Sequence, residues 1–171
     1  MRMPFLGFTF AIAAQAASAM SLSSADFADN ATIPQVHYYP RCGGENLSPQ
    51  LSWKGVPGSA KSLMLTMIDL DVPPNLWSHW IVAGLPASSM GLARGARLPA
   101  GAHAIVSNFG DPFYDGPCPP EGSGIHRYRI TLWALSVADP HFAPNAPAKD
   151  LQTVLDGMAI DHASITGTVR R

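Results

Sequence analysis

Gly and Pro occur so often along this chain that the segments between them are mostly too short for helices and have the length of β-strands. It has 15 Gly and 16 Pro among 171 residues, about half as many again as an average composition would give. Both residues interrupt helices and central strands, Gly by its backbone freedom and Pro by its missing amide donor. The remaining apolar segments have strand length and predict a mainly β fold; they are 51–54, 62–68, 77–82, 104–106, 128–137 and 165–169.

One late segment has helical periodicity instead. Leu151, Val154, Leu155 and Met158 fall at i, i+3, i+4 and i+7, which puts them on one face of a helix over 148–163. No repeat, charge block or long linker divides the chain, so we expect one domain. The sequence therefore predicts a β-sandwich-like domain with a C-terminal helix.

The first residues have the features of an export signal. Arg2 precedes an apolar stretch over 5–17, and Ala17-Ser18-Ala19 has the small residues that signal peptidase accepts. The stretch is too short for a membrane anchor, whereas a buried N-terminal helix remains an alternative. We predict a signal peptide over 1–19, a mature domain over 20–171, and a periplasmic or secreted protein.

Charge and cysteine content narrow the class of ligand and the compartment. The formal net charge is −1, so no global field attracts nucleic acid or an anionic membrane, and an anion would need a local site. Cys42 and Cys118 match no C-x-x-C redox or zinc spacing. In an exported chain we favour a disulfide between them; two separate buried thiols are the alternative.

Polar residues gather at the ends of three predicted strands. Alternation along a strand predicts that Asp69 and Asp71 point the same way, as do Trp77 and His79, and His126 and Tyr128. Taken singly these pairs are weak signals. Asp-x-Asp is common in turns, and single His or Trp residues are more often structural.

Three segments in order give these pairs a context. They are residues 42–53 (CGGENLSPQLSW), residues 69–80 with DLDVP followed by WSHW, and residues 114–128 with YDGPCPP followed by GIHRY. Together they resemble the signature regions of the phosphatidylethanolamine-binding protein family, in its bacterial Raf-kinase-inhibitor-like branch. The resemblance runs from about residue 26 to residue 168. The chain departs from the family pattern at Leu70, where Pro is usual, and at Val72, where Ala is usual.

The resemblance implies two antiparallel sheets in a Greek-key β-sandwich and a small pocket at one end. That pocket would hold phosphate, a phosphoethanolamine-like head group or a small carboxylate, with Trp77 at its rim. We expect one aspartate to orient His79 and favour its charged form, and the backbone near Gly116 to donate to the anion. The implied ligand-binding residues are Asp69, Asp71, Trp77, His79, Gly116, Pro119, His126 and Tyr128.

The resulting hypothesis is a non-catalytic binding protein for a small anion, with no cofactor and with a regulatory role as one option. One alternative is an inhibitor of a protease or another protein partner. A second is a hydrolase that uses His79 with Asp69, and a homodimer is also open. Asp69, Asp71, His79 and His126 include metal-ligand types, but no tight spacing supports a metal site. The other histidines are interpreted as surface or structural: His37, His103, His141 and His162.

Overall fold

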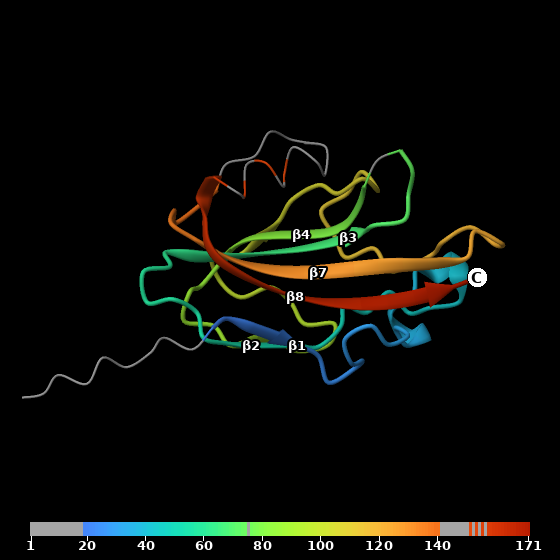
Figure 1. Ribbon diagram of the computed structural model, residues 1–171, viewed down its shortest axis with the longest axis horizontal. Coiled ribbons are helices and arrows are strands. Elements are labelled where there is room, and N and C mark those ends of the chain that lie inside the picture. The colour runs from blue at the N-terminus through green and yellow to red at the C-terminus, as the bar shows by residue number, and fades with distance from the viewer. Residues whose placement is uncertain (1–18, 75, 141–150, 152, 154, 156) are drawn as a thin grey trace, which may run out of the picture.

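The computed structural model describes residues 19–74, 76–140, 151, 153, 155 and 157–171. Their strands form two antiparallel sheets, with orders β1-β2-β5 and β6-β4-β3-β7-β8, and the sheets lie one above the other (Figure 1). The mainly β prediction is confirmed. The strands are β1 (Ser21–Ser23), β2 (Leu51–Lys54), β3 (Ser62–Asp69), β4 (Trp77–Leu85), β5 (Gly91–Leu92), β6 (His103–Ala104), β7 (Ile125–Leu135) and β8 (Ala159–Arg170).

Strand β3 is the centre of the larger sheet. It pairs with β4 on one side and β7 on the other, and all eight of its residues are buried. A nearly continuous apolar sequence is typical of a strand covered on both faces. The prediction of a central strand here is therefore confirmed.

Apolar side chains cover both faces of the larger sheet. On the face toward the smaller sheet, Leu65 and Met67 pack in one cluster with Leu51 and Trp53 of β2. On the opposite face, Met64 belongs to a second cluster. The strand places alternate side chains on opposite faces, so β3 contributes to both clusters.

The C-terminal helix predicted over 148–163 is not confirmed. Its last part, 159–163, belongs to strand β8 instead, and residues 148–150, 152, 154 and 156 lie outside the described residues. Leu151 and Leu155 are buried in the second cluster, as their apolar character required. The described residues 151, 153, 155, 157 and 158 are helical, but from Ala159 onward the chain pairs with β7 as strand β8, and this tertiary pairing ends the helical segment.

Other sequence-based boundaries need smaller corrections. Strands β1 and β5 were not predicted, because three- and two-residue strands carry too little pattern. The strand expected over 104–106 is β6, at His103–Ala104. The Greek-key arrangement is not confirmed and stays a prediction.

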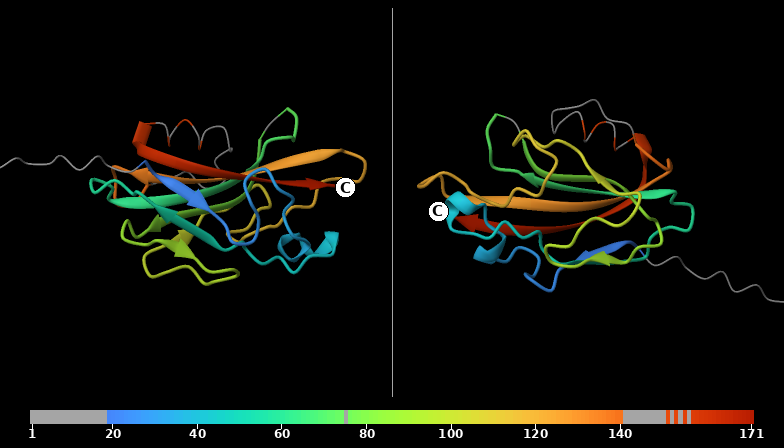
Figure 2. Two further views of the ribbon diagram at one scale, coloured as in Figure 1. Left: turned by 60° about the horizontal axis from the view of Figure 1, so that its bottom comes forward. Right: turned by 180° about the vertical axis from the view of Figure 1, so that it is seen from behind.

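Two connections close the ends of this framework. Residues 31–33 lie along β8, where Thr32 bridges Thr168 in parallel and the Ile33 amide donates to the Thr168 carbonyl at 3.0 Å. Two short 3-10 helices, η1 (Gln35–His37) and η2 (Pro40–Cys42), follow and lie beside the end of β8 (Figures 1 and 2). A disulfide joins Cys42 to Cys118, with Cα atoms 5.5 Å apart, which confirms the predicted pairing.

Candidate functional site

A cavity of about 200 Å³ lies where β3 ends and where β4 and β7 begin. Pairing of Asp69 with both Trp77 and Tyr128 brings the three strand ends together. Six of the predicted site residues line this cavity, and five other residues join them. The lining is Arg41, Asp69, Val72, Trp77, His79, Phe109, Cys118, Pro119, Pro120, His126 and Tyr128.

Asp69 and His126 form a buried pair in the cavity wall. The His126 Nδ1 lies 2.7 Å from Asp69 Oδ2, and both side chains are almost completely buried. The other carboxylate oxygen of Asp69 accepts the backbone amide of Asp71 at 2.9 Å. Asp69 therefore fixes the positions of His126 and Asp71, and each of its carboxylate oxygens already has a hydrogen-bond donor.

His79 is oriented by a backbone carbonyl rather than by an aspartate. Its Nδ1 donates to the Asp115 carbonyl at 2.7 Å, and its ring packs against Phe109 and Tyr128 at centroid distances of 5.0 and 5.1 Å. Burial lowers the pKa of His79 to about 4. The Asp69 charge favours the protonated ring, as predicted, but burial outweighs it. The prediction that an aspartate orients the ring is wrong, and in the neutral ring Nε2 is an acceptor.

The buried Tyr128 hydroxyl lies near the Asp69 carboxylate but makes no well-formed hydrogen bond to a described residue. Its side chain is completely buried and lines the cavity. Burial, together with the Asp69 charge, raises the pKa of Tyr128, so the hydroxyl keeps its proton. A buried donor without a partner is costly, and a ligand in the cavity would provide the missing acceptor.

Asp71 does not line the cavity. Because β3 ends at Asp69, the alternation that predicted a shared face for the two aspartates does not extend to Asp71. Its carboxylate binds Arg127 in a bidentate pair, at 2.7 Å to Nη2 and 3.0 Å to Nε. This guanidinium lowers the pKa of Asp71.

Gly116 also lies outside the cavity lining, and its role is in packing. Its amide donates to Asn46 Oδ1 at 2.8 Å, so that amide is already occupied. A Cβ atom here would lie 1.9 Å from the His37 carbonyl oxygen. The glycine therefore lets two backbone segments approach each other closely.

Arg41 is the functional candidate that sequence reasoning missed. It is exposed, lines the cavity, and has no carboxylate within ion-pair distance among the described residues. The available signal was its position beside Cys42, since the predicted disulfide carries it to the segment around Cys118. An unpaired guanidinium at a cavity is well suited to bind an oxyanion.

The four residues of metal-ligand type do not all lie in one site. Asp69, His79 and His126 line the cavity, but Asp71 is paired with Arg127 outside it. In the part of the chain that the structure describes, no group of three or more His, Cys, Asp or Glu residues is arranged to hold a metal ion. His37 is buried, with Nδ1 2.7 Å from the Leu47 carbonyl, which fits a structural role.

The fold and the site define a small two-sheet domain with one histidine- and tyrosine-lined cavity at its strand ends. The family model described as phosphatidylethanolamine-binding protein matches residues 23–170. The chain belongs to this family, as the sequence motifs predicted.

Individual relatives agree with the family model. A UPF0098 protein of Methanothermobacter thermautotrophicus is 40% identical over 157 residues, covering 89% of this chain and 99% of the relative. A Mycobacterium tuberculosis protein, whose name describes it as a lipoprotein (LppC), is 38% identical and covers 91% of this chain and 74% of its own length. The crystal structure of Escherichia coli YbcL, titled a member of the mammalian PEBP family, superposes with a TM-score of 0.83 at 29% identity. It covers 90% of this chain and 99% of YbcL.

A separate observation concerns membranes. Within the described ranges, none of the helices is both long enough and apolar enough to cross a bilayer.

Proposed function

We propose that the cavity binds a small oxyanion, either phosphate or the phosphorylated head group of a larger molecule. The observation that carries this proposal is the unpaired Arg41 guanidinium at the same cavity as the unpartnered Tyr128 hydroxyl. Both groups are hydrogen-bond donors, and a guanidinium adds a positive charge. An oxyanion is the ligand class that satisfies both.

His79 narrows the choice of oxyanion. Its Nδ1 donates to the Asp115 carbonyl, so in the neutral ring Nε2 accepts a hydrogen bond. Inorganic phosphate keeps a protonated oxygen near neutral pH, and that oxygen can donate to Nε2, whereas a phosphomonoester is mostly fully ionised there. Sulfate has no such proton, so we expect the cavity to prefer phosphate over sulfate.

Binding without turnover is supported by the lining. The hydroxyl among the lining residues belongs to Tyr128, whose raised pKa keeps it protonated, and the cavity cysteine, Cys118, is held in a disulfide. Neither group is an activated nucleophile. The Asp69–His126 pair is the arrangement closest to an acid–base pair.

An extracytoplasmic location is part of the same proposal. It is supported by the signal-like residues 1–19, by the disulfide, which is typical of oxidising compartments, and by the relative named as a lipoprotein. Recovery of the mature chain starting at Met20 from a periplasmic or secreted fraction would test it.

Arg41→Gln should weaken phosphate binding by roughly tenfold to a hundredfold, because a hydrogen bond to a charged group contributes about 1.5–3 kcal/mol. Titration calorimetry with phosphate and phosphoethanolamine measures this. Arg97→Gln is the matched control, since Arg97 is also an exposed arginine but lines a different cavity. Equal affinity of the two variants, or equal binding of phosphate and sulfate by the unmodified protein, would count against the proposal.

Tyr128→Phe should weaken phosphate binding while leaving the free protein as stable or about 1 kcal/mol more stable. The substitution removes a buried hydroxyl that has no partner in the described structure, and such a group costs about 1–3 kcal/mol. Tyr114→Phe is the control, because the Tyr114 hydroxyl donates to the His37 carbonyl at 3.0 Å. This control should lose about 1 kcal/mol of unfolding free energy and keep its phosphate affinity; the opposite pattern would exclude Tyr128 as a ligand donor.

A further inference from the structure

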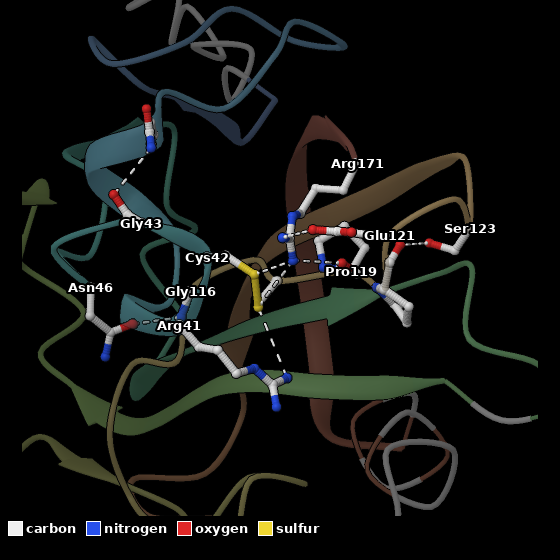
Figure 3. The surroundings of a disulfide bond; sticks show 12 residues. Arg41, Cys42, Gly43, Asn46, Gly116, Pro119, Glu121, Ser123 and Arg171 are labelled. Atoms are coloured by element: carbon white, nitrogen blue, oxygen red, sulfur yellow. Dashed lines mark hydrogen bonds and ion pairs between the residues drawn. A yellow bond between two sulfur atoms is a disulfide. The ribbon is translucent and has the colours of Figure 1, made fainter.

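The Cys42–Cys118 disulfide lies between two guanidinium groups. Arg171 Nη1 is 2.6 Å from Cys42 Sγ and 3.8 Å from Cys118 Sγ. On the other side, Arg41 Nη2 is 4.0 Å from Cys118 Sγ. Figure 3 shows the two arginines reaching the sulfur atoms from different parts of the chain. Such surroundings stabilise a thiolate relative to a thiol.

The position of Arg171 is supported by neighbouring groups. Its Nη2 pairs with Glu121 Oε1 at 3.0 Å, and its Nη1 donates to the Pro119 carbonyl at 3.3 Å. Glu121 is largely exposed, so water screens its charge. Glu121 thus holds the guanidinium in place, with Nη1 directed at the sulfur atoms (Figure 3).

The two sulfur atoms have different surroundings. Cys118 lines the cavity, whereas Cys42 is not among its lining residues. Arg171 lies closer to Cys42 than to Cys118. A thiol that enters the cavity therefore meets Cys118 first, and the sulfur that would leave is the one next to the guanidinium.

We propose that this disulfide is a thiol–disulfide exchange site for small thiols that carry an anionic group. The incoming thiolate attacks Cys118 Sγ and forms a new S–S bond with it. The Cys42–Cys118 bond breaks, and its electron pair goes to Cys42 Sγ, which becomes a thiolate beside Arg171. The preference for an anionic thiol rests on the proposed anion site at Arg41, while the position of attack does not.

Attack at Cys118 is favoured because the leaving group, the Cys42 thiolate, is stabilised by Arg171. Exchange is faster when the departing thiol has a lower pKa, and an adjacent arginine lowers a thiol pKa. Cys42 has the nearest guanidinium nitrogen, Arg171 Nη1 at 2.6 Å, whereas the guanidinium nitrogens of Arg171 and Arg41 lie 3.8 and 4.0 Å from Cys118 Sγ. We therefore expect a mixed disulfide at Cys118 and a free thiol at Cys42.

The test treats the folded, oxidised protein with 2-mercaptoethanesulfonate or with the cationic thiol cysteamine. Each rate is normalised to that thiol's rate with a small-molecule disulfide. Free thiols are trapped with iodoacetamide, and peptide mass mapping locates the products. We expect 2-mercaptoethanesulfonate to form its mixed disulfide with Cys118, and iodoacetamide to alkylate the released Cys42 thiol. The normalised rate should be higher for the sulfonate thiol than for cysteamine. A mixed disulfide mainly on Cys42 would overturn the proposal.

Arg171→Gln gives the second readout. Exchange should be roughly tenfold slower in this variant, because the leaving-group pKa rises. Arg170→Gln is the matched control: Arg170 is the neighbouring arginine on β8 and is exposed, and its exchange rate should not change. Thermal unfolding of both oxidised variants checks that they fold, and an unchanged rate in folded Arg171→Gln would contradict the proposal.

Phosphate calorimetry on the same oxidised protein separates the two proposals. If phosphate does not bind, the anion site fails, yet attack at Cys118 and its dependence on Arg171 can still be observed. If phosphate binds, but the mixed disulfide does not form at Cys118 or the exchange rate is unchanged in Arg171→Gln, only the proposal of the exchange site is wrong.

Discussion

Gly116→Ala is expected to destabilise the fold by about 3 kcal/mol or more, because it inserts a methyl group into closely packed backbone. The new Cβ would lie 1.9 Å from the His37 carbonyl oxygen and 2.7 Å from the Tyr39 amide nitrogen. These atoms are all backbone, so no side-chain rotation can relieve the contact. Chemical denaturation of the purified variant measures the loss of unfolding free energy.

Gly58→Ala is the control for this substitution. A Cβ at Gly58 meets no heavy atom within 4 Å, so we expect a change within about 1 kcal/mol, with slight stabilisation from the less flexible unfolded chain. If Gly116→Ala is equally mild, the loop has room that the structure does not show. Gly116 follows Asp115, whose carbonyl holds His79, so any displacement of this loop should also weaken phosphate binding.

Asp69→Ala is expected to cost about 2–5 kcal/mol of unfolding free energy, because it leaves two buried polar groups without acceptors and each such group costs about 1–3 kcal/mol. The substitution leaves the buried His126 Nδ1 and the Asp71 amide without their acceptors. Urea denaturation at neutral pH, followed by tryptophan fluorescence, gives the comparison with the unmodified protein.

Asp71→Ala is the matched control, because it removes the same residue type two positions further on. Asp71 pairs with Arg127 in a bidentate contact, but the Arg127 side chain is 56% exposed. Ion pairs of this kind contribute about 0–1 kcal/mol, and loss of the Arg127 amide bond to Asp71 Oδ2, at 2.8 Å, adds about 1 kcal/mol. Similar losses of unfolding free energy for the two variants would show that the buried Asp69–His126 contact does not stabilise the fold more than the exposed Asp71–Arg127 pair.

Asp69 and Asp71 show where prediction of side-chain direction from the sequence stops being valid. Alternation of side chains holds only while the strand continues, and β3 ends at Asp69. The same rule worked for His126 and Tyr128, because β7 runs through both residues. Residues within a strand could therefore be placed from the sequence, while the first residues after it could not.

The loops limited the prediction in a second way. His79 is oriented by the Asp115 carbonyl, and Arg41 reaches the cavity from η2; neither contact follows from side-chain chemistry or spacing. The family motifs pointed to Gly116, which lies outside the cavity lining and lets two backbone segments pack closely. Backbone geometry in irregular segments depends on tertiary contacts that no local pattern records.

The fold itself was easier to predict where the signal was long and apolar. β3 and β7 were recognised from their composition, whereas β8 was partly mistaken for a helix. The side chains of β8 alternate between more and less exposed positions, but Ala, Asp, His and Ser in its first half lack the apolar contrast that reveals a strand. Pairing with β7 decides the conformation of this segment.

The position of β8 has a consequence for the order of assembly during translation. Both β7 and the segment 31–33 use β8 as a hydrogen-bonding partner, yet β8 is synthesised long after residues 31–33. Until it emerges, a nascent chain has an open sheet edge at β7 and an unanchored early segment. A chain in which β8 has not yet paired is therefore incompletely folded, and its open strand edge is the surface that a chaperone would shield.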